Sequence, residues 1–170
     1  MIVSIPITPA QAPFRNEAAC TQTQIAVNMP QITGSTNTGG LSILSYQLEW
    51  ATGAGSYTAL VGASPSSLAT AYQVGVAETL TTGTNYKFRY LVKNEAGSSV
   101  AYSPILSTYA AVVPSSVSAP TTSIVGYDVQ IDWSAPSSTG GLPITVYKVY
   151  VKGKDNVWYH ETTTCSVTAI

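Results

Sequence analysis

Few side chains in this sequence could carry out catalysis. The chain has 170 residues with one histidine, His160, and eight carboxylates. A multi-histidine metal site is excluded within one chain, and nothing near His160 supplies the partners that a catalytic site needs, so we expect an exposed strand residue. The carboxylates form no D-x-D cluster or calcium-loop signature. The pairs Gly39-Gly40 and Gly140-Gly141 read as turn glycines and not as a phosphate loop. The sequence therefore predicts no enzyme, no metal site and no cofactor.

Aromatic residues near the end of the chain allow two interpretations. Trp158-Tyr159, with Tyr150 eight residues before Trp158, could form a platform for stacking a sugar ring. The same residues would also arise where two neighbouring strands pack together, because aromatic side chains pair across strands routinely. We favour strand packing and keep the platform as the alternative.

The two cysteines, Cys20 and Cys165, fall at positions that a hydrophobic residue would usually take. Buried free thiols are one interpretation. The other is a disulfide between neighbouring molecules, since a secreted chain rarely keeps free thiols. A bridge within the chain would need the two Cα atoms within about 7 Å of each other, which we do not expect because the two cysteines fall in separate predicted domains.

The composition points away from nucleic acid and towards the cell exterior. Charged residues make up 9% of the chain and the net charge is −1, so there is no basic surface for nucleic acid. No apolar run approaches the roughly 18 residues of a membrane span, so no membrane insertion is expected. Serine and threonine form roughly a quarter of the chain, above the usual share. Hydroxyl groups and sugars would then solubilise the protein in place of charges, and we expect an extracellular or cell-surface location.

The hydroxyl-rich stretches lie in predicted loops, at residues 33–38, 64–67, 115–123 and 137–139. They could carry O-linked glycans, or they could be ordinary loop hydroxyls, and composition does not separate the two. No N-x-S/T sequon is present, so N-linked glycans are not expected.

The stretch 80–97 states the fold most clearly. Tyr86, Phe88 and Tyr90 alternate with Lys87 and Arg89, which is the pattern of a strand with one buried and one solvated face. Turn residues flank the strand on both sides.

This stretch resembles the sixth strand of fibronectin type III domains. The family motif L-x-P-G-T-x-Y appears as Leu80, Gly83, Thr84 and Tyr86, followed by Asn94 and Gly97; the family proline is replaced by Thr82. The resemblance implies an all-β fold of immunoglobulin-like sandwiches. It also implies that Tyr86 is a corner tyrosine whose hydroxyl bonds to upstream backbone.

The preceding residues supply the other strands of this first domain, residues 9–112. Ile25, Val27 and Met29 alternate, and Ile43, Tyr46, Leu48 and Trp50 match the family's third strand; residues 33–40 between them read as a flexible loop. Residues 70–80, with Val76 inward, and residues 102–109 complete the set. Because the third and sixth strands are neighbours in this fold, we expect Glu49 to pair with Arg89 or Lys87.

The pattern then repeats in residues 113–170. Gly140 follows Gly39 by 101 positions (140 − 39), close to the length of one such domain. Trp133 corresponds to the core tryptophan of the family's second strand. Residues 144–151, which include Tyr147, repeat the third strand, and residues 165–170 resemble the end of the fifth. The repeat contains no counterpart of the last two strands, so we expect a partial domain. The predicted structural core of the two domains comprises Trp50, Leu80, Tyr86, Phe88, Tyr90, Trp133 and Tyr147.

Residues 1–8 form a strand-like segment that we expect to have no place in the first domain. Ile2, Val3, Ile5 and Ile7 are the apolar positions expected to take part in assembly, together with the two cysteines. A surplus strand at one end and missing strands at the other suggest head-to-tail strand complementation between copies of the chain. The simpler explanation is that the sequence is a fragment of a longer tandem array, and both stay open.

Two functions are compatible with these features. The first is an extracellular structural or adhesive protein, the repeating unit of a fibre or surface coat. The second is a non-catalytic binding module, either an accessory domain of a secreted carbohydrate-active enzyme or part of a receptor ectodomain. The fold alone does not choose between them, because one sandwich hosts many functions.

Overall fold

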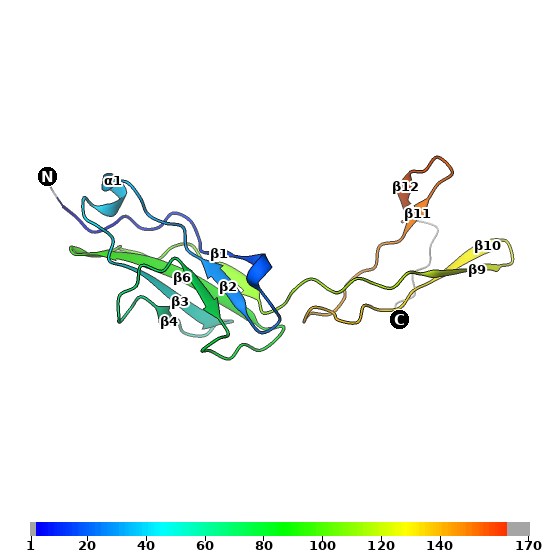
Figure 1. Ribbon diagram of the computed structural model, residues 1–170, viewed down its shortest axis with the longest axis horizontal. Helices are drawn as coiled ribbons and strands as arrows, with labels where there is room; N and C mark the ends of the chain where they lie inside the picture. The colour runs from blue at the N-terminus through cyan, green and yellow to red at the C-terminus, as the bar shows by residue number, and fades with distance from the viewer. Residues whose placement is uncertain (1–2, 163–170) are drawn as a thin grey trace. The chain divides into compact units, whose positions relative to one another are not determined.

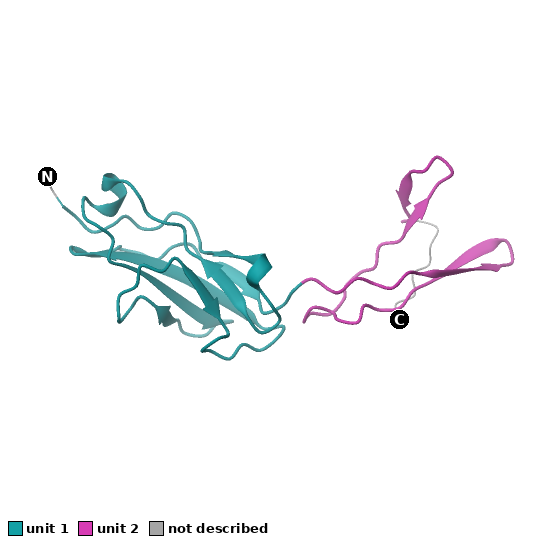
Figure 2. Ribbon diagram, in the orientation of Figure 1, with its two compact units in different colours: residues 1–112 teal, residues 113–170 magenta. Residues whose placement is uncertain are grey.

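The computed structural model describes residues 3 to 162, and the chain is all-β apart from two short helices. It divides into two compact units, residues 1–112 and 113–170 (Figure 2). Each unit is described by itself.

Unit 1 consists of two antiparallel sheets (Figure 1). The first has the order β1-β2-β5, and the second has the order β4-β3-β6-β7, with β8 also paired to β6. The elements are β1 (Phe14–Arg15), a 3₁₀ helix (Glu17–Ala19), β2 (Ile25–Asn28), α1 (Ser35–Thr38), β3 (Ser45–Thr52), β4 (Thr58–Val61), β5 (Ala71–Val74), β6 (Asn85–Asn94), β7 (Gly97–Ser98) and β8 (Leu106–Tyr109).

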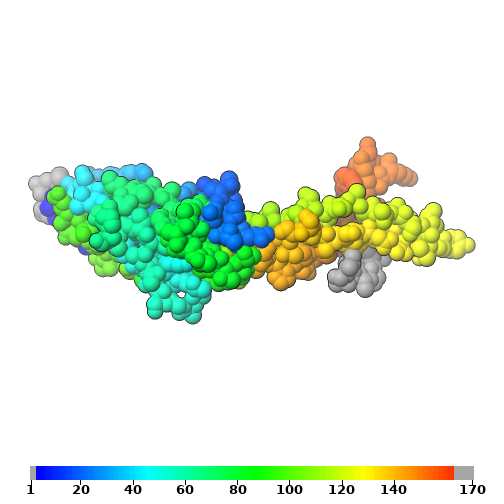
Figure 3. Space-filling model, turned by 60° about the horizontal axis from the view of Figure 1, so that its bottom comes forward, coloured from blue at the N-terminus to red at the C-terminus, as the bar shows by residue number. Residues whose placement is uncertain are grey.

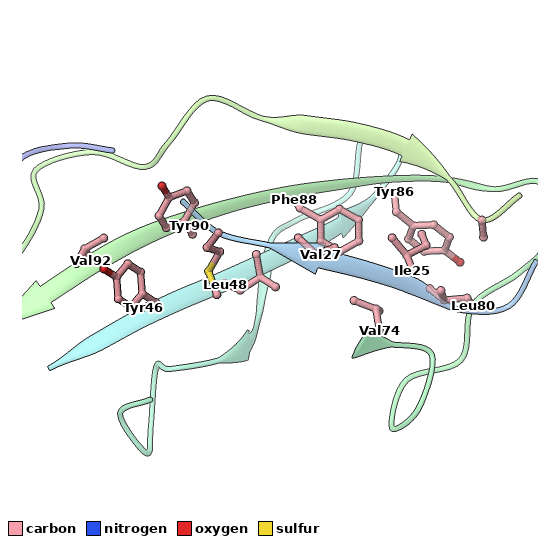
Figure 4. Packing of buried hydrophobic residues seen from close by; sticks show 12 residues of the cluster. Ile25, Val27, Tyr46, Leu48, Val74, Leu80, Tyr86, Phe88, Tyr90 and Val92 are labelled. Carbon is pink, nitrogen blue, oxygen red and sulfur yellow. The ribbon is translucent and has the colours of Figure 1, made fainter. Parts of the chain in front are cut away.

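The core lies between these sheets because alternate residues of their strands point inward. Along β6, Tyr86, Phe88 and Tyr90 are buried, and they meet Ile25 and Val27 of β2 (Figure 4). Both faces contribute large apolar side chains, and burying them supplies the main driving force for folding. The buried cluster comprises Ile25, Val27, Met29, Tyr46, Leu48, Val74, Leu80, Tyr86, Phe88, Tyr90, Val92 and Ala110.

The corner tyrosine has the expected geometry. The Tyr86 hydroxyl accepts a hydrogen bond from the backbone N–H of Thr81 over 2.9 Å, which ties the entry of β6 to the preceding loop. Trp50 of β3 is half-buried and stacks on the Tyr86 ring, with centroids 5.3 Å apart. With this corner and strand order, unit 1 is an immunoglobulin-like β-sandwich.

Two local expectations for unit 1 were wrong. The loop at residues 33–40 contains the short helix α1, which ends at Gly39 in the left-handed conformation with φ of 70°. The fifth strand stops at Val74, because Gly75 has a φ of +97° and turns the chain away from the sheet. Val76, expected to point inward, is 72% exposed.

Residues 1–8 were expected to have no place in the first domain, and this expectation was also wrong for the part that the structure describes. The Ser4 N–H donates to the Gly39 carbonyl and the Ile7 N–H to the Asn37 carbonyl, each over 2.9 Å. Pro6 between them is fully buried. The segment binds to unit 1 because unit 1 provides backbone carbonyl groups as hydrogen-bond acceptors and buries the ring of Pro6. Ile2 lies outside the described residues.

Unit 2 contains two separate antiparallel hairpins. One pairs β9 (Thr121–Val125) with β10 (Asp128–Asp132), and the other pairs β11 (Tyr150–Lys152) with β12 (Trp158–His160). No strand pairing joins them among residues 113 to 162. In the space-filling view the β9–β10 hairpin, coloured yellow, projects from unit 2 and is exposed on the side in view (Figure 3).

The predicted core of the second domain is only partly formed. Trp133 and Tyr147 are half-buried and contact each other, with ring centroids 5.8 Å apart. The repeat of the third strand is limited to Tyr150–Lys152, so the expected strand over residues 144–151 was too long. In the described part of unit 2 no hydrophobic side chain is fully buried, because the two hairpins do not form the paired sheets of a sandwich. The expected strand at 165–170 lies outside the described residues, as does Cys165.

Candidate functional site

The outer face of the β3–β6 pair carries a cluster centred on Arg89, which we call the Arg89 cluster: Gln47, Glu49, Tyr57, Arg89 and Tyr102. The β3–β6 register places Glu49 directly opposite Arg89. The guanidinium Nε and Nη2 both donate to Glu49 Oε2, over 3.1 and 2.9 Å. The expectation of a cross-strand pair at Glu49 is confirmed with Arg89.

Two tyrosine rings enclose the guanidinium of Arg89. Its Cζ lies 3.8 Å from the ring centroid of Tyr57 and 3.7 Å from that of Tyr102. These are cation–π distances, and the planar guanidinium suits stacking on both sides. The cation is therefore held by a carboxylate in its plane and by aromatic rings above and below it.

The Glu49 carboxylate is fully occupied within this cluster. Its Oε1 accepts hydrogen bonds from the Tyr102 hydroxyl over 2.7 Å and from Gln47 Nε2 over 2.8 Å. Burial of the Tyr102 phenol, together with the hydrogen bond to Glu49, raises the pKa of Tyr102 above its ordinary value. A carboxylate with both oxygens engaged and a stacked, paired arginine leave no group to act as a base or a nucleophile. We interpret the Arg89 cluster as structural.

The second surface is on unit 2, along one face of the β11–β12 hairpin, and we call it the aromatic strip: Tyr150, Lys152, Trp158 and His160. Tyr150 pairs with His160 and Lys152 with Trp158 in the hairpin register. The Tyr150 and His160 rings stack with centroids 4.9 Å apart, and Lys152 Nζ lies 5.9 Å from the Trp158 ring centroid. Tyr150 is 51% exposed and Trp158 is 63% exposed, so the strip is an open surface.

The register of the repeat indicates which way the aromatic strip faces. The match that aligns Gly140 with Gly39 aligns Tyr150 with Glu49, whose side chain lies on the outer face of unit 1. The aromatic strip thus corresponds to the outer face, while Val151 and Tyr159 correspond to the core side. The predicted platform of Tyr150, Trp158 and Tyr159 does not form on one face, because Tyr159 lies on the opposite face of the hairpin from the other two. The stacking of Tyr150 on His160 agrees with the strand-packing interpretation.

Other candidate groups form no site in the described residues. No three histidine, cysteine, aspartate or glutamate side chains within residues 3–162 lie close enough together to hold a metal ion. Cys20 is a free thiol that packs partly against the core, and its Sγ lies 3.2 Å from the Asn16 carbonyl and 3.3 Å from the Ala26 nitrogen. A hollow of about 330 Å³ along residues 59–67 is lined only by small, apolar and hydroxyl residues.

Among residues 3–162, no helix is both long enough and apolar enough to cross a bilayer.

Comparison with known proteins gives matches at the level of solved structures. The chain is similar to the third fibronectin III domain of the human KIAA0343 protein, with a TM-score of 0.46 and 12% identity over 62% of this chain and 83% of that one. It is also similar to titin module A71 from human cardiac muscle, with a TM-score of 0.41 and 25% identity over 59% of this chain and 91% of that one. No family model and no curated protein sequence matches the chain.

Sequence reasoning found only part of these surfaces. Strand alternation and the order of neighbouring strands predicted that Glu49 would pair with Arg89 or Lys87, and the register selects Arg89. Tyr57 and Tyr102 were missed because both lie outside regular strands, 32 residues before and 13 residues after Arg89, and no period marks them. The sequence identified the aromatic residues of the strip, but only the hairpin register showed on which face of the hairpin each of them lies.

Proposed function

We propose that this chain is a non-catalytic structural or adhesive module of an extracellular assembly, and that it associates with copies of itself. The observation that carries the proposal is the exposed apolar surface of the β9–β10 hairpin in unit 2. Ile124 of β9 is 81% exposed, and Val129 of β10, its cross-strand partner, is 64% exposed. Apolar surface and unpaired strand edges of this kind associate with other protein surfaces.

Several features support a structural role over an enzymatic one. Within the Arg89 cluster, Gln47, Arg89 and Tyr102 all bond to Glu49, and only the buried Tyr57 hydroxyl lacks a hydrogen-bond partner among the described residues. Sandwich modules of this architecture are common in cell-surface proteins. The low charge and the hydroxyl-rich loops are typical of a protein that meets solvent outside the cell.

Head-to-tail association is the form that we propose for this contact. The edges of unit 1 are short, since β4 and β5 have four residues each and β1 has two. The open edges belong to unit 2, and the head-to-tail form pairs them with the extended N-terminal segment of the next copy, which is a contact between unlike surfaces. A contact between unlike surfaces that does not close into a ring produces a filament.

Strand donation by Val3, Ile5 and Ile7 is one mechanism for such a contact. Because residues 4–7 bond to their own unit, donation would require Ser4 and Ile7 to leave Gly39 and Asn37. Donation would therefore occur only if the next molecule bound the segment more strongly than Gly39 and Asn37 of its own unit do.

A matched pair of variants tests self-association. Val129→Lys places a charge on the apolar side of β10, and Gln130→Lys places the same charge on the next residue of the same strand. We expect sedimentation velocity over a concentration series to show weaker association of the first variant, by about tenfold or more in Kd, and little change in the second. A wild-type chain that stays monomeric at the highest concentrations would refute the proposal.

Deletion of residues 1–8 tests the donation mechanism separately. If donation operates, the deletion abolishes filaments seen by electron microscopy while near-ultraviolet circular dichroism shows that unit 1 remains folded. Filaments of unchanged stability would instead leave self-association standing and exclude donation.

The aromatic strip supports a second candidate, a non-catalytic carbohydrate-binding module. Exposed aromatic rings beside Lys152 and His160 offer stacking faces and hydrogen-bond donors on an outer surface. Calorimetric titration with cello-, chito- and xylo-hexaose would show binding that Trp158→Ala abolishes and Tyr127→Ala, on the other hairpin, leaves intact. Absence of heat with all three sugars would remove this candidate.

A further inference from the structure

The described part of the N-terminal segment lies on the loop that joins β2 and β3. Besides the Ser4 and Ile7 amide bonds, the side chain of Asn94 at the end of β6 donates to the Ser4 carbonyl over 2.7 Å and to the Thr38 carbonyl over 2.8 Å. Asn94 is fully buried and so bridges the segment and the loop. A buried amide that satisfies two carbonyls in this way indicates a built docking site.

Glycine residues allow the close approach of the two backbones. A Cβ atom at Gly39 would lie 2.1 Å from the Ser4 carbonyl oxygen, a distance that backbone atoms cannot accommodate. A Cβ atom at Gly97 would lie 3.1 Å from Ile5 Cγ2, which is tight packing. Both glycines lie against the N-terminal segment, so the loop between β2 and β3 and the start of β7 together form its binding site.

Unit 2 contains a counterpart of one of these backbone bonds within itself. The Ser115 N–H donates to the Ser138 carbonyl over 3.0 Å, and the Ser138 N–H returns a bond to Ser115 Oγ over 3.0 Å. Ser138 is the counterpart of Asn37 at the spacing of 101 that relates the two glycine pairs. The bond from Ser115 to Ser138 is therefore the counterpart of the bond from Ile7 to Asn37.

The sequences around the two bonds share a pattern. In both units the donating residue follows a proline, as Pro6-Ile7 and Pro114-Ser115, and the accepting residue precedes Thr-Gly-Gly, as in residues 37–40 and 138–141. Gly39 and Gly140 both have positive φ, 70° and 77°, and both are buried. Proline presets an extended approach, and the glycines turn the loop so that its carbonyl faces the segment.

We propose that each unit has a segment-docking site on its Thr-Gly-Gly loop, and that the occupant is an extended Pro-X segment that leads into the same unit. Residues 4–8 occupy the site in unit 1, and residues 113–117 occupy it in unit 2. The N-terminal segment is thus the equivalent of the stretch between the two units and not an unmatched strand. The inference stands independently of self-association, because every contact it uses lies within one unit.

Amide hydrogen exchange measured by NMR on the full chain tests the pairing directly. We expect the amides of Ser4, Ile7 and Ser115 to exchange on the order of tenfold more slowly than those of Ile5 and Ser116, which have no acceptor among the described residues. Protection at Ile7 without protection at Ser115 would overturn the equivalence of the two sites. Equal exchange at all five amides would overturn docking altogether.

Two matched pairs of variants separate docking from general destabilisation. Gly39→Ala and Gly53→Ala both force alanine into a positive φ, but a Cβ at Gly53 meets nothing within 4 Å. We expect only Gly39→Ala to remove the protection of Ser4 and Ile7. Ser115→Ala removes the returned bond from Ser138, whereas Ser116→Ala does not, so only the first should speed exchange at residue 115, by about fivefold. Equal effects within either pair would refute the site in that unit.

Discussion

Tyr86 shows how one hydroxyl group secures the corner of the first sandwich. Its ring is buried against Trp50, while its oxygen accepts a hydrogen bond from the Thr81 N–H. The variant Tyr86→Phe keeps the ring and leaves that N–H without its partner. We expect a loss of about 1 kcal/mol in the free energy of unfolding, measured by chemical denaturation. Tyr109→Phe, at a half-exposed ring, is the control and should change stability by less than about 0.5 kcal/mol.

Arg89 is stabilised by its shape as well as by its charge. Lysine at this position would keep the charge but lose the two-donor contact with Glu49 and the stacking between Tyr57 and Tyr102. We expect Arg89→Lys to lower the free energy of unfolding by about 1–2 kcal/mol. Lys87→Arg, on the same face of β6, should have little effect. Equal stability of Arg89→Lys and the wild type would show that stacking contributes nothing.

Tyr90 makes unit 1 sensitive to alkaline pH. Burial, with a smaller contribution from the nearby Tyr46, raises the pKa of Tyr90 from 10.0 to about 12, and the neutral phenol donates to the Pro30 carbonyl over 3.0 Å. The folded-state pKa is above that of the unfolded chain, so this contribution is complete below pH 10 and is lost as pH rises through about 12. We expect the free energy of unfolding to fall in that window, with a smaller slope in Tyr90→Phe. Parallel curves for the two proteins would contradict the assignment.

At the scale of the elements, Gly75 determines where β5 ends. Its φ of +97° suits glycine, and a Cβ atom there would lie 2.2 Å from the Thr23 carbonyl oxygen. We expect Gly75→Ala to cost about 2 kcal/mol or more, because backbone strain and a steric clash add together. Gly53→Ala, which carries only the conformational strain, should cost about 1 kcal/mol. Equal costs in a denaturation experiment would show that the contact with Thr23 is unimportant.

A comparison of β5 with β6 shows why the ends of a strand are harder to predict than its existence. Alternation in β6 identified Tyr86, Phe88 and Tyr90 as one face, because a period of two follows from strand geometry alone. Alternation also continued through Val76, but a close approach between distant backbones ended the strand earlier. Such an approach depends on the partner segment around Thr23 and leaves no mark on the local pattern.

At the scale of the whole molecule, the hydroxyl-rich loops bear on how the protein is modified. Ser116 and Ser118 are exposed in the described structure, as O-glycan acceptors must be, whereas the predicted loop at residues 115–123 is shorter than expected because β9 begins at Thr121. We expect proteolytic peptides that contain Ser116 and Ser118, prepared from the natural source, to exceed the mass of the bare peptides by multiples of a hexose or a similar unit. Peptide masses equal to those of the bare sequence would remove the glycan proposal for this stretch, and protein made in a host without O-glycosylation provides the reference.

The sequence by itself determined the all-β class, the buried face of β6, the corner tyrosine and a cross-strand ion pair at Glu49 with either Arg89 or Lys87. These features depend on alternation and on short motifs, which are local properties of a chain. Only the tertiary structure decided that residues 4–7 bond to their own unit, that Tyr57 and Tyr102 enclose Arg89, and that Trp133 and Tyr147 remain half-buried. Each of these depends on contacts between segments far apart in the sequence, and those contacts are selected by the burial and hydrogen bonding of the folded chain as a whole.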